Sequence, residues 1–283
     1  MSASRALLPL RGRHCLITGA SGGIGAAIAR RFAADGALVT LTGRNESKLQ
    51  SVLSQLTPYG QSGLSPVDSS KATPPSTPQA SLEHSYKVLD LSASPKTGPN
   101  EDSYELQHAT LDSIWQRTGQ IDVLVNAAGV AQWQLLQKTS LDEARDMLDT
   151  NLMGAILTSK FLARQMKRRT ADRDACIINI SSLLAQKGVP GASVYAASKA
   201  GLLGLTTALA AELSPFRIRT NAIVPGYIET DMLASMSREA LEKKIPLRRL
   251  GTSDEVADAA AFLAQNPYAN NCILNLDGGL SAI

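Results

Sequence analysis

A tyrosine and a lysine stand four positions apart in the segment SVYAASKAG, residues 193–201. Residues i and i+4 are neighbours on a helix surface, so Tyr195 and Lys199 can lie side by side if this segment is helical. A free phenol, with a pKa near ~10, exchanges protons poorly at neutral pH, and a nearby ammonium lowers that pKa by roughly 1–3 units. The pair therefore suits proton delivery to a carbonyl oxygen, although the spacing alone also fits an exposed helix face.

Small residues surround this pair. Ala196, Ala197, Ala200 and Gly201 would let the helix lie close to a cofactor and to a neighbouring sheet. Reduction of a carbonyl needs a hydride at carbon as well as a proton at oxygen, and a nicotinamide is a common source of the hydride. The segment thus raises the expectation of a dinucleotide-binding fold.

A glycine-rich turn, TGASGGIG at 18–25, is the element that such a cofactor needs, and it lies between an apolar run and a helical pattern. Gly19, Gly23 and Gly25 allow a tight turn and let a pyrophosphate approach the helix N-terminus, where unpaired N–H groups and the helix dipole favour an anion. The spacing differs from the usual Gly-x-Gly-x-x-Gly, and plain tight turns also use glycine. The position between strand and helix nevertheless favours dinucleotide binding.

The second expected strand ends in an arginine. Folds that bind NAD usually place an acid there to bind the ribose hydroxyls, but the segment LTGRN, residues 41–45, has Arg44 instead. A guanidinium binds a 2′-phosphate through two hydrogen bonds, whereas a carboxylate repels it. We therefore expect NADP(H). A solvated arginine at a helix start is the alternative. Glu46 also lies close enough that NAD stays a possible cofactor.

Apolar runs and helical periodicities alternate about seven times along the chain. Strands are expected at 14–18, 37–42, 86–91, 121–126, 175–181, 218–224 and 272–276, and helices at 23–36, 45–56, 104–118, within 140–168, 194–213 and 254–265. Continuous Val/Ile/Leu runs are typical of parallel strands that helices cover on both faces. The fold class is therefore α/β: a single-domain doubly wound Rossmann fold with about seven parallel strands.

One long segment breaks this alternation. Residues 57–84 are rich in Pro, Ser, Thr and Gln and show no period, so they are expected to form a low-complexity surface insertion. A second loose stretch covers 92–103. Because the alternation resumes afterwards, a single domain is expected over 12–283, after a basic N-terminal arm, residues 1–11, that lacks the apolar core of a secretory signal.

Composition excludes several classes of protein. The net charge is +3 and only 4% of residues are aromatic, so neither a basic field nor a base-stacking surface for nucleic acid is indicated. No apolar run approaches the roughly 20 residues that span a bilayer. Cys15, Cys176 and Cys272 have no metal-binding spacing and are expected to be buried free thiols in a reducing compartment. We expect an intracellular protein without metal, nucleic acid or membrane span.

Six segments together make the chain resemble the short-chain dehydrogenase/reductase family. They are TGASGGIG (18–25), NAAG (126–129), DTNLMGA around Asn151, INISS (178–182), YAASK (195–199) and PGYIETDM (225–232). In order and spacing they cover nearly the whole chain from residue 12, apart from the insertion. The resemblance implies a nicotinamide-dependent oxidoreductase acting on hydroxyl and carbonyl groups.

The resemblance implies four catalytic residues. Ser182, thirteen positions before Tyr195, would donate a hydrogen bond to the substrate oxygen, while Ser181 would be structural. Tyr195 would deliver the proton, and Lys199 would tune the tyrosine and hold the nicotinamide ribose. Asn151 would brace a helix and a water relay behind the lysine; a helix-interior asparagine satisfied by backbone is the alternative.

The resemblance also implies a set of cofactor contacts along the chain. These residues are Gly19, Ser21, Gly23, Ile24, Gly25, Arg44, Asp90, Asn126, Tyr195, Lys199, Ile228 and Thr230. For Asp90, expected near the adenine ring, a helix cap or turn former is the alternative. Many NADPH-preferring members carry an arginine where Gly22 stands, so the expected NADP preference depends on Arg44.

The segments GYIETDM, IPLRRLGTSDEVADAAAFL and LDGGL are most similar to the 3-oxoacyl-[acyl-carrier-protein] reductases of fatty acid synthesis, in particular the mitochondrial carbonyl reductase type. This similarity implies a 3-oxoacyl substrate, free or carrier-bound, in the mitochondrial matrix or cytoplasm. It also implies a homotetramer in which the helices of 140–168 and 194–213 pair between subunits.

Two alternatives to that function stay open. The chain could reduce other carbonyls, such as quinones, steroids or sugars, or it could be a catalytically idle NADP-binding subunit of a heteromeric reductase. The presence of all four catalytic residue types argues against the idle subunit. Substrate choice is expected to depend on residues about 132–140, 183–194 and 227–247.

Two basic clusters could dock an acidic acyl carrier protein, although a charge run is more often a solvated face. One cluster lies within 164–174 and the other within 243–249. Their residues are Arg164, Lys167, Arg168, Arg169 and Arg173, and Lys243, Lys244, Arg248 and Arg249.

Overall fold

The structure is a computed structural model of the chain, and it describes residues 9–59, 83–92, 103–131, 133–167, 174–234 and 236–283. Most of the expected insertion (60–82), most of the second loose stretch (93–102) and residues 1–8 of the expected arm lie outside the described residues. Leu10 is fully buried in the core and its amide donates to the carbonyl of Asp35 at 3.0 Å. The packed domain therefore begins by Leu10, earlier than the expected boundary at residue 12.

Seven parallel strands form one sheet in the order β3-β2-β1-β4-β5-β6-β7. Their bounds are β1 His14–Thr18, β2 Leu38–Gly43, β3 Ser85–Val88, β4 Val123–Asn126, β5 Ala175–Ile180, β6 Ile218–Pro225 and β7 Ile273–Leu276. Successive strands run outward from β1 on one side and from β4 on the other, which makes the boundary between β1 and β4 the topological switch point. Ligands of such sheets bind beyond the carboxyl ends of the strands at this point.

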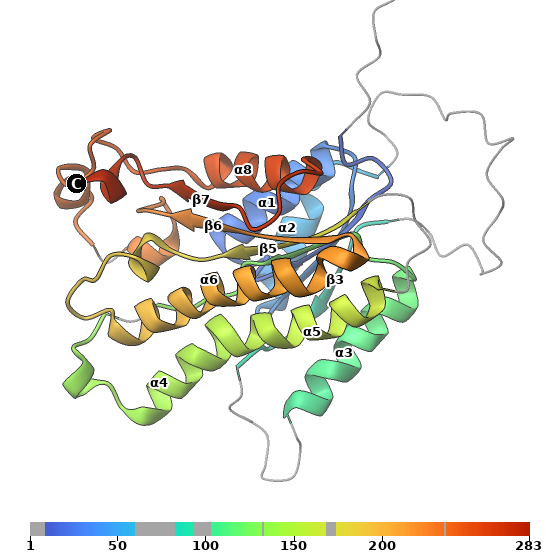
Figure 1. Cartoon of the computed structure of the whole chain (residues 1–283), viewed down its shortest axis with the longest axis horizontal. Helices are drawn as coiled ribbons and strands as arrows, with labels where there is room; N and C mark the ends of the chain where they lie inside the picture. Colours follow the sequence, from blue (N-terminus) through green and yellow to red (C-terminus); the bar gives the residue numbers. More distant parts are fainter. Residues whose placement is uncertain (1–8, 60–82, 93–102, 132, 168–173, 235) are drawn as a thin grey trace, which may run out of the picture.

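Helices cover both faces of the sheet, which confirms the predicted doubly wound architecture (Figure 1). One layer holds α1 (Gly23–Ala34), α2 (Glu46–Ser54) and α8 (Ser253–Gln265). The other holds α3 (Ser103–Thr118), α4 (Leu141–Leu148), α5 (Gly154–Met166) and α6 (Ser193–Leu213). A short helix that the sequence analysis did not predict, α7 (Arg238–Glu242), follows β6.

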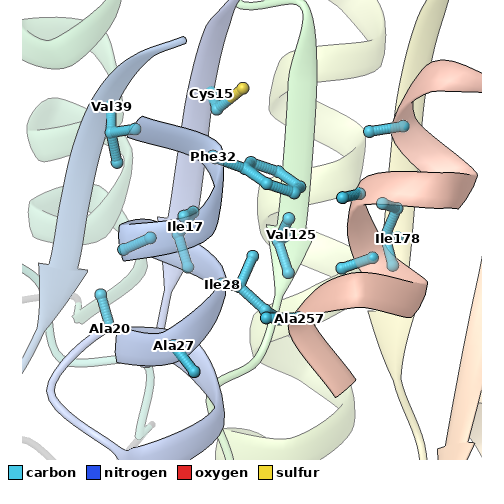
Figure 2. Packing of buried hydrophobic residues seen from close by; sticks show 14 of the residues in the cluster. Cys15, Ile17, Ala20, Ala27, Ile28, Phe32, Val39, Val125, Ile178 and Ala257 are labelled. Atoms are coloured by element: carbon cyan, nitrogen blue, oxygen red, sulfur yellow. The ribbon is translucent and has the colours of Figure 1, made fainter. Parts of the chain in front are cut away.

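The larger core cluster lies between the sheet and the layer of α1 and α8. Phe32 and Ile28 of α1 face Val125 of β4, and Ala257 of α8 lies beside Ile28 (Figure 2). Alanines along α1 and α8 let these two helices pack closely against each other and against the strands. This packing fixes the position of the α1 N-terminus above the switch point.

Helix α6 is both long and apolar. The segment Ser193–Phe216 reaches a mean hydropathy of 1.2 and is long enough to cross a membrane, by length and composition alone. The expectation that no apolar run in the chain approaches the length of a membrane span is therefore wrong for this helix. The helix lies along the sheet and contains the buried Lys199. On its outer side, Ala197, Ala200 and Gly204 are exposed small residues.

Candidate active site

Two adjoining hollows lie at the carboxyl edge of the sheet. The larger, a cleft, runs along the glycine turn, the ends of β2 and β4 and the start of α2. The smaller, a pocket, lies against Ser182, Tyr195 and the segment after β6. Ile24, Trp133, Thr230 and Met232 line both hollows, so the cleft and the pocket meet at these residues.

The glycine turn leaves room for a ligand beside the backbone. Gly19 has a positive φ of +64°, and a Cβ there would lie 2.5 Å from the amide nitrogen of Ala128, so no other residue fits. Helix α1 begins at Gly23 and no side chain caps its N-terminus. Gly19, Ser21, Gly23, Ile24 and Gly25, the expected cofactor contacts of this turn, all line the cleft. An uncapped helix end with a glycine cradle fits the pyrophosphate of a dinucleotide.

Charged side chains stand at the far end of this cleft. Arg44 is exposed at the end of β2 and lines the cleft, together with Lys48 of α2, whose Nζ lies 3.4 Å from Asp231 Oδ2. Glu46 accepts a hydrogen bond from the Tyr86 hydroxyl at 2.9 Å and does not line the cleft. This end of the cleft therefore carries two cationic side chains, Arg44 and Lys48, and one carboxylate, Asp231.

Ser182 and Tyr195 face the pocket together. Ser182 follows β5, and its Oγ accepts a hydrogen bond from the Leu184 amide at 3.2 Å, which leaves its own proton free to donate. Burial raises the pKa of Tyr195, and a hydrogen bond with Ser182 offsets part of that rise. At neutral pH the phenol therefore carries its proton. A protonated phenol beside a hydroxyl donor suits protonation of a carbonyl oxygen.

Lys199 lies one turn further along α6 and is buried. Its Nζ donates to the carbonyl oxygen of Ile180 at 2.9 Å and lies 5.8 Å from the centroid of the Tyr195 ring. Burial lowers the pKa of Lys199 to about 8. The expected pair is thus on one helix face, but burial, not the ammonium, has the largest effect on the pKa of the phenol. The expectation that the ammonium lowers the pKa of Tyr195 is therefore wrong as stated: burial raises that pKa above its ordinary value.

Asn151 lies in a π-helical turn, Asp149–Met153, that joins α4 to α5. Its side-chain amide makes two hydrogen bonds with the backbone of Val130: Oδ1 accepts from the Val130 N–H at 2.8 Å, and Nδ2 donates to the Val130 carbonyl oxygen at 2.9 Å. Nδ2 also donates to Ser198 Oγ at 3.0 Å. Asn151 therefore ties the loop after β4 to helix α6, which agrees with a bracing role and also with the satisfied asparagine considered as its alternative.

Two expected cofactor contacts lie outside the cleft. Asn126 is buried and its amide bonds to Thr158, Ser159 and Asn179, so the side chain supports the cleft floor from below. Asp90 follows β3, and its Oδ1 accepts hydrogen bonds from the amide and the hydroxyl of Ser92, the geometry of a turn former. Their strand-end positions suggested cofactor contact, but their side chains point to protein partners.

The remaining predicted contacts, Ile228 and Thr230, both line the pocket beside Tyr195, and Thr230 also lines the cleft. Lys48, Trp133 and Met232 also line these hollows and were not named from the sequence. Trp133 and Met232 fall within the stretches expected to govern substrate choice. Nothing in the sequence indicated that Lys48 lines the cleft, because exposed lysines are common on helices.

The basic clusters are only partly available for a partner. Lys243 pairs with Glu239, and Arg249 pairs with Glu255. Lys167 lies with Nζ 4.2 Å above the ring of Phe216. Three arginines of the first cluster lie outside the described residues: Arg168, Arg169 and Arg173.

No group of three or more His, Cys, Asp or Glu side chains in the described ranges could hold a metal ion. None of the three cysteines forms a disulfide; Cys15 and Cys176 are buried and Cys272 is half-buried. The groups at the catalytic pocket are therefore the hydroxyls of Ser182 and Tyr195, with the Lys199 ammonium behind them.

Comparison with known sequences gives two family matches. Residues 102–281 match the family described as enoyl-(acyl carrier protein) reductase, and residues 13–76 match the family described as short chain dehydrogenase. The chain is 40% identical over 174 residues to human 3-oxoacyl-[acyl-carrier-protein] reductase, covering 62% of this chain and 72% of that protein. It is 35% identical to zebrafish carbonyl reductase family member 4, covering 96% of this chain and 99% of that protein.

A solved structure is also similar throughout. A short-chain type dehydrogenase/reductase from Mycobacterium marinum superposes with a TM-score of 0.80 at 29% identity, covering 98% of each chain. The similarity therefore includes both the glycine turn and the segments that carry Ser182 and Tyr195.

Proposed function

Because this chain belongs to the short-chain dehydrogenase/reductase family, we propose that it uses NADPH to reduce the 3-oxo group of an acyl thioester to a hydroxyl. One observation carries the proposal: the Ser182 and Tyr195 hydroxyls face an uncharged pocket, and this pocket adjoins the cleft that the glycine turn lines. Relatives named 3-oxoacyl-[acyl-carrier-protein] reductase support the choice of carbonyl.

The side chains divide the work of such a reduction. When bound, the reduced nicotinamide supplies a hydride to the carbonyl carbon. Ser182 donates a hydrogen bond to the carbonyl oxygen and so polarises it. Tyr195 releases its proton to the same oxygen as negative charge develops there. Lys199, held by Ile180 behind the phenol, stabilises the resulting phenolate through its charge.

The cationic end of the cleft supports NADP(H) over NAD(H). Within the described residues no carboxylate pairs with Arg44, so its guanidinium is free to bind a 2′-phosphate through charge-assisted hydrogen bonds. Lys48 lines the same end of the cleft, and its ammonium, now paired with Asp231 at 3.4 Å, would be available to a bound 2′-phosphate. Because Gly22 stands where many NADPH-preferring relatives have arginine, these two side chains carry the preference.

The assembly and the location are also proposals. The exposed small residues of α6 would let the same helix of a second subunit approach closely, as expected for the family's homotetramers. An acidic acyl carrier would dock against the unpaired basic residues of the two clusters. We place the enzyme inside the cell, in the mitochondrial matrix or cytoplasm.

The test is NADPH consumption with 3-oxobutanoyl and longer 3-oxoacyl thioesters, compared between wild type and Tyr195→Phe. We expect wild-type turnover and a loss of at least about a hundredfold in the variant, because proton transfer by a positioned group contributes roughly 10²–10⁴. Both proteins should bind NADPH equally in a fluorescence titration. If wild type and variant are equally inactive on all carbonyls yet bind NADPH, the protein is instead an idle NADP-binding subunit.

A further inference from the structure

Two large apolar side chains, Trp133 and Met232, are exposed where the pocket meets the cleft. We propose that Trp133 and Met232 form an apolar mouth that holds the alkyl chain of the substrate, so that the enzyme selects 3-oxoacyl groups by chain length. The substrate class rests on the function proposed above. The role of the mouth in recognising alkyl chains is a separate claim and can be tested separately.

Exposure sets these two residues apart. Trp133 is 37% exposed and Met232 is 42% exposed, so neither is buried in a hydrophobic core cluster. They come from different segments, the loop after β4 and the turn after β6, and both line the pocket and the cleft. Exposed apolar surface concentrated at the rim of a catalytic pocket is typical of a ligand contact.

The position of Trp133 is fixed relative to the catalytic tyrosine. The next residue, Gln134, donates its amide hydrogen to the carbonyl of Gly191 at 2.9 Å. Gly191 lies two residues before α6 begins, and Tyr195 is in the first turn of that helix. The backbone of the loop that carries Trp133 is therefore anchored beside the catalytic helix, which places the indole next to the pocket.

Inside the mouth the pocket wall stays apolar. Leu183 and Leu184 are buried, and Leu183 also belongs to a core cluster against which Tyr227 and Leu233 pack. These residues form a wall that is held rigid by the core, in contrast to the two free side chains at the rim. Desolvation in this region raises the pKa of Tyr227 as well as that of Tyr195.

The lining contains no Lys, Arg, Asp or Glu. Its polar side-chain groups are the hydroxyls of two serines, two tyrosines and one threonine and the indole N–H of Trp133; the reacting carbonyl uses the hydroxyls of Ser182 and Tyr195. A sugar would need several further hydrogen-bond partners, because buried hydroxyls without partners lose affinity. An alkyl chain needs none. The chemistry of the wall therefore favours a carbonyl flanked by an unbranched apolar chain.

Burial of each methylene should raise kcat/KM by roughly three- to fourfold while the chain still contacts the mouth. The experiment uses N-acetylcysteamine thioesters of 3-oxobutanoate, 3-oxohexanoate and 3-oxooctanoate with saturating NADPH. The readout is the ratio of kcat/KM for 3-oxooctanoyl to that for 3-oxobutanoyl, which cancels effects on cofactor binding. We expect a ratio of about ten or more in wild type, and about three or less in Trp133→Ala and in Met232→Ser.

Two further variants control for size and aromatic character. Trp133→Phe should keep most of the ratio, because a ring still covers the chain. Tyr268→Ala removes an aromatic side chain that is 96% exposed and lines none of the hollows at the site, so its ratio should equal that of wild type. A wild-type ratio near one, or an unchanged ratio in Trp133→Ala, overturns the proposal.

Binding without turnover separates this proposal from the proposed function. Isothermal calorimetry with the NADP⁺-loaded protein measures the affinity of the matching 3-hydroxyacyl thioesters. If no thioester is reduced but affinity still rises with chain length in wild type and not in Trp133→Ala, the proposed reaction is wrong and the proposed alkyl-binding mouth is supported. If thioesters are reduced but affinity does not depend on chain length, the proposed mouth is wrong and the proposed reaction is supported.

Discussion

Lys199 donates a hydrogen bond from Nζ to the backbone carbonyl oxygen of Ile180 at 2.9 Å, and this contact ties helix α6 to the end of strand β5. The ammonium is buried, and the loss of hydration lowers its pKa to about 8. Lys199 therefore carries its charge below about pH 8 and loses it above. The charge that stabilises a developing phenolate is available only on the acidic side of that value.

We expect kcat/KM for carbonyl reduction to fall as the pH rises through about 8. Tyr195 keeps its proton over this range because burial raises its pKa, so the alkaline limb reports Lys199. The measurement is a pH profile from about 6 to 10 for wild type and Lys199→Arg. A guanidinium stays charged over this range, so the slower variant should lack the limb. An identical limb in both proteins would assign it to another group.

Gly129→Ala is expected to lower kcat by about tenfold without a large loss of stability. A Cβ at this position would lie 3.2 Å from Lys199 Nζ and 3.4 Å from Asn151 Oδ1, so the lysine must move to accommodate it. A displacement of this kind at a catalytic group costs roughly 1–2 kcal/mol in the transition state. Steady-state kinetics and thermal unfolding check both parts. Gly188→Ala, with no atom within 4 Å of the added Cβ, serves as the matched control.

Arg44→Ala is expected to reduce the preference for NADPH over NADH by about tenfold to a hundredfold, the worth of hydrogen bonds to a charged group. The measurement is the ratio of kcat/KM with the two cofactors. Glu46→Gln provides the control, because that carboxylate bonds to Tyr86 outside the cleft. An unchanged ratio in Arg44→Ala, or an equal change in Glu46→Gln, would remove Arg44 from cofactor recognition.

The strands and the glycine turn were predictable because local patterns determine them. Each of the seven apolar runs became a strand, and two strands have four residues where six were expected: β3, Ser85–Val88 against 86–91, and β4, Val123–Asn126 against 121–126. The third run ends early because Asp90 forms a turn with Ser92, a local hydrogen bond that competes with strand pairing. The same turn explains why Asp90 is not in the cleft.

Contacts between distant segments could not be read from the sequence. The i, i+4 spacing places Tyr195 and Lys199 on one face, but the acceptor for Nζ is Ile180, which reaches the site only when β5 packs beside α6. Likewise the π-helical turn around Asn151 depends on its pairing with Val130, twenty-one residues earlier. Such partners depend on the tertiary fold and have no periodic signature.

Arg219→Met is expected to destabilise the protein by about 3 kcal/mol, the cost of breaking a buried polar network. The buried guanidinium of Arg219 donates to the carbonyls of Leu263 and Ala264 at the C-terminal end of α8, and to Ala269. Methionine fills similar volume but leaves these acceptors unpaired and removes a cation from the negative end of the helix dipole. Thermal unfolding should show a decrease in Tm of roughly 6–10 °C.

The control for this prediction is Arg217→Met. Arg217 is two residues earlier and its side chain is 60% exposed beside Asp174, so its loss should cost less than about 1 kcal/mol. Equal destabilisation by the two variants would show that general loss of charge, not the buried network, is responsible. Activity per folded molecule should be unaffected in both, because neither arginine lines the cleft or the pocket.

His84 makes stability depend on pH. Its Nδ1 accepts a hydrogen bond from the Val39 amide at 3.1 Å, so Nε2 carries the proton and donates to the Thr57 carbonyl at 2.7 Å. Protonation of Nδ1 would break the contact with Val39. Burial lowers the pKa of His84, and also that of the buried His14, below the ordinary value of 6.5.

The folded state therefore binds fewer protons than the unfolded state when the pH is just below 6.5, and the free energy of unfolding must decrease as the pH falls in that range. Well above pH 6.5 both histidines are neutral in the folded and in the unfolded state, so their contribution to the free energy of unfolding no longer changes with pH. We expect Tm to decrease between about pH 7 and 5.5 in wild type and to decrease less in His84→Gln, which cannot titrate. His108→Gln is the control, because His108 lies exposed beside Asp112. If His84→Gln keeps the full wild-type dependence, His84 is not the group responsible.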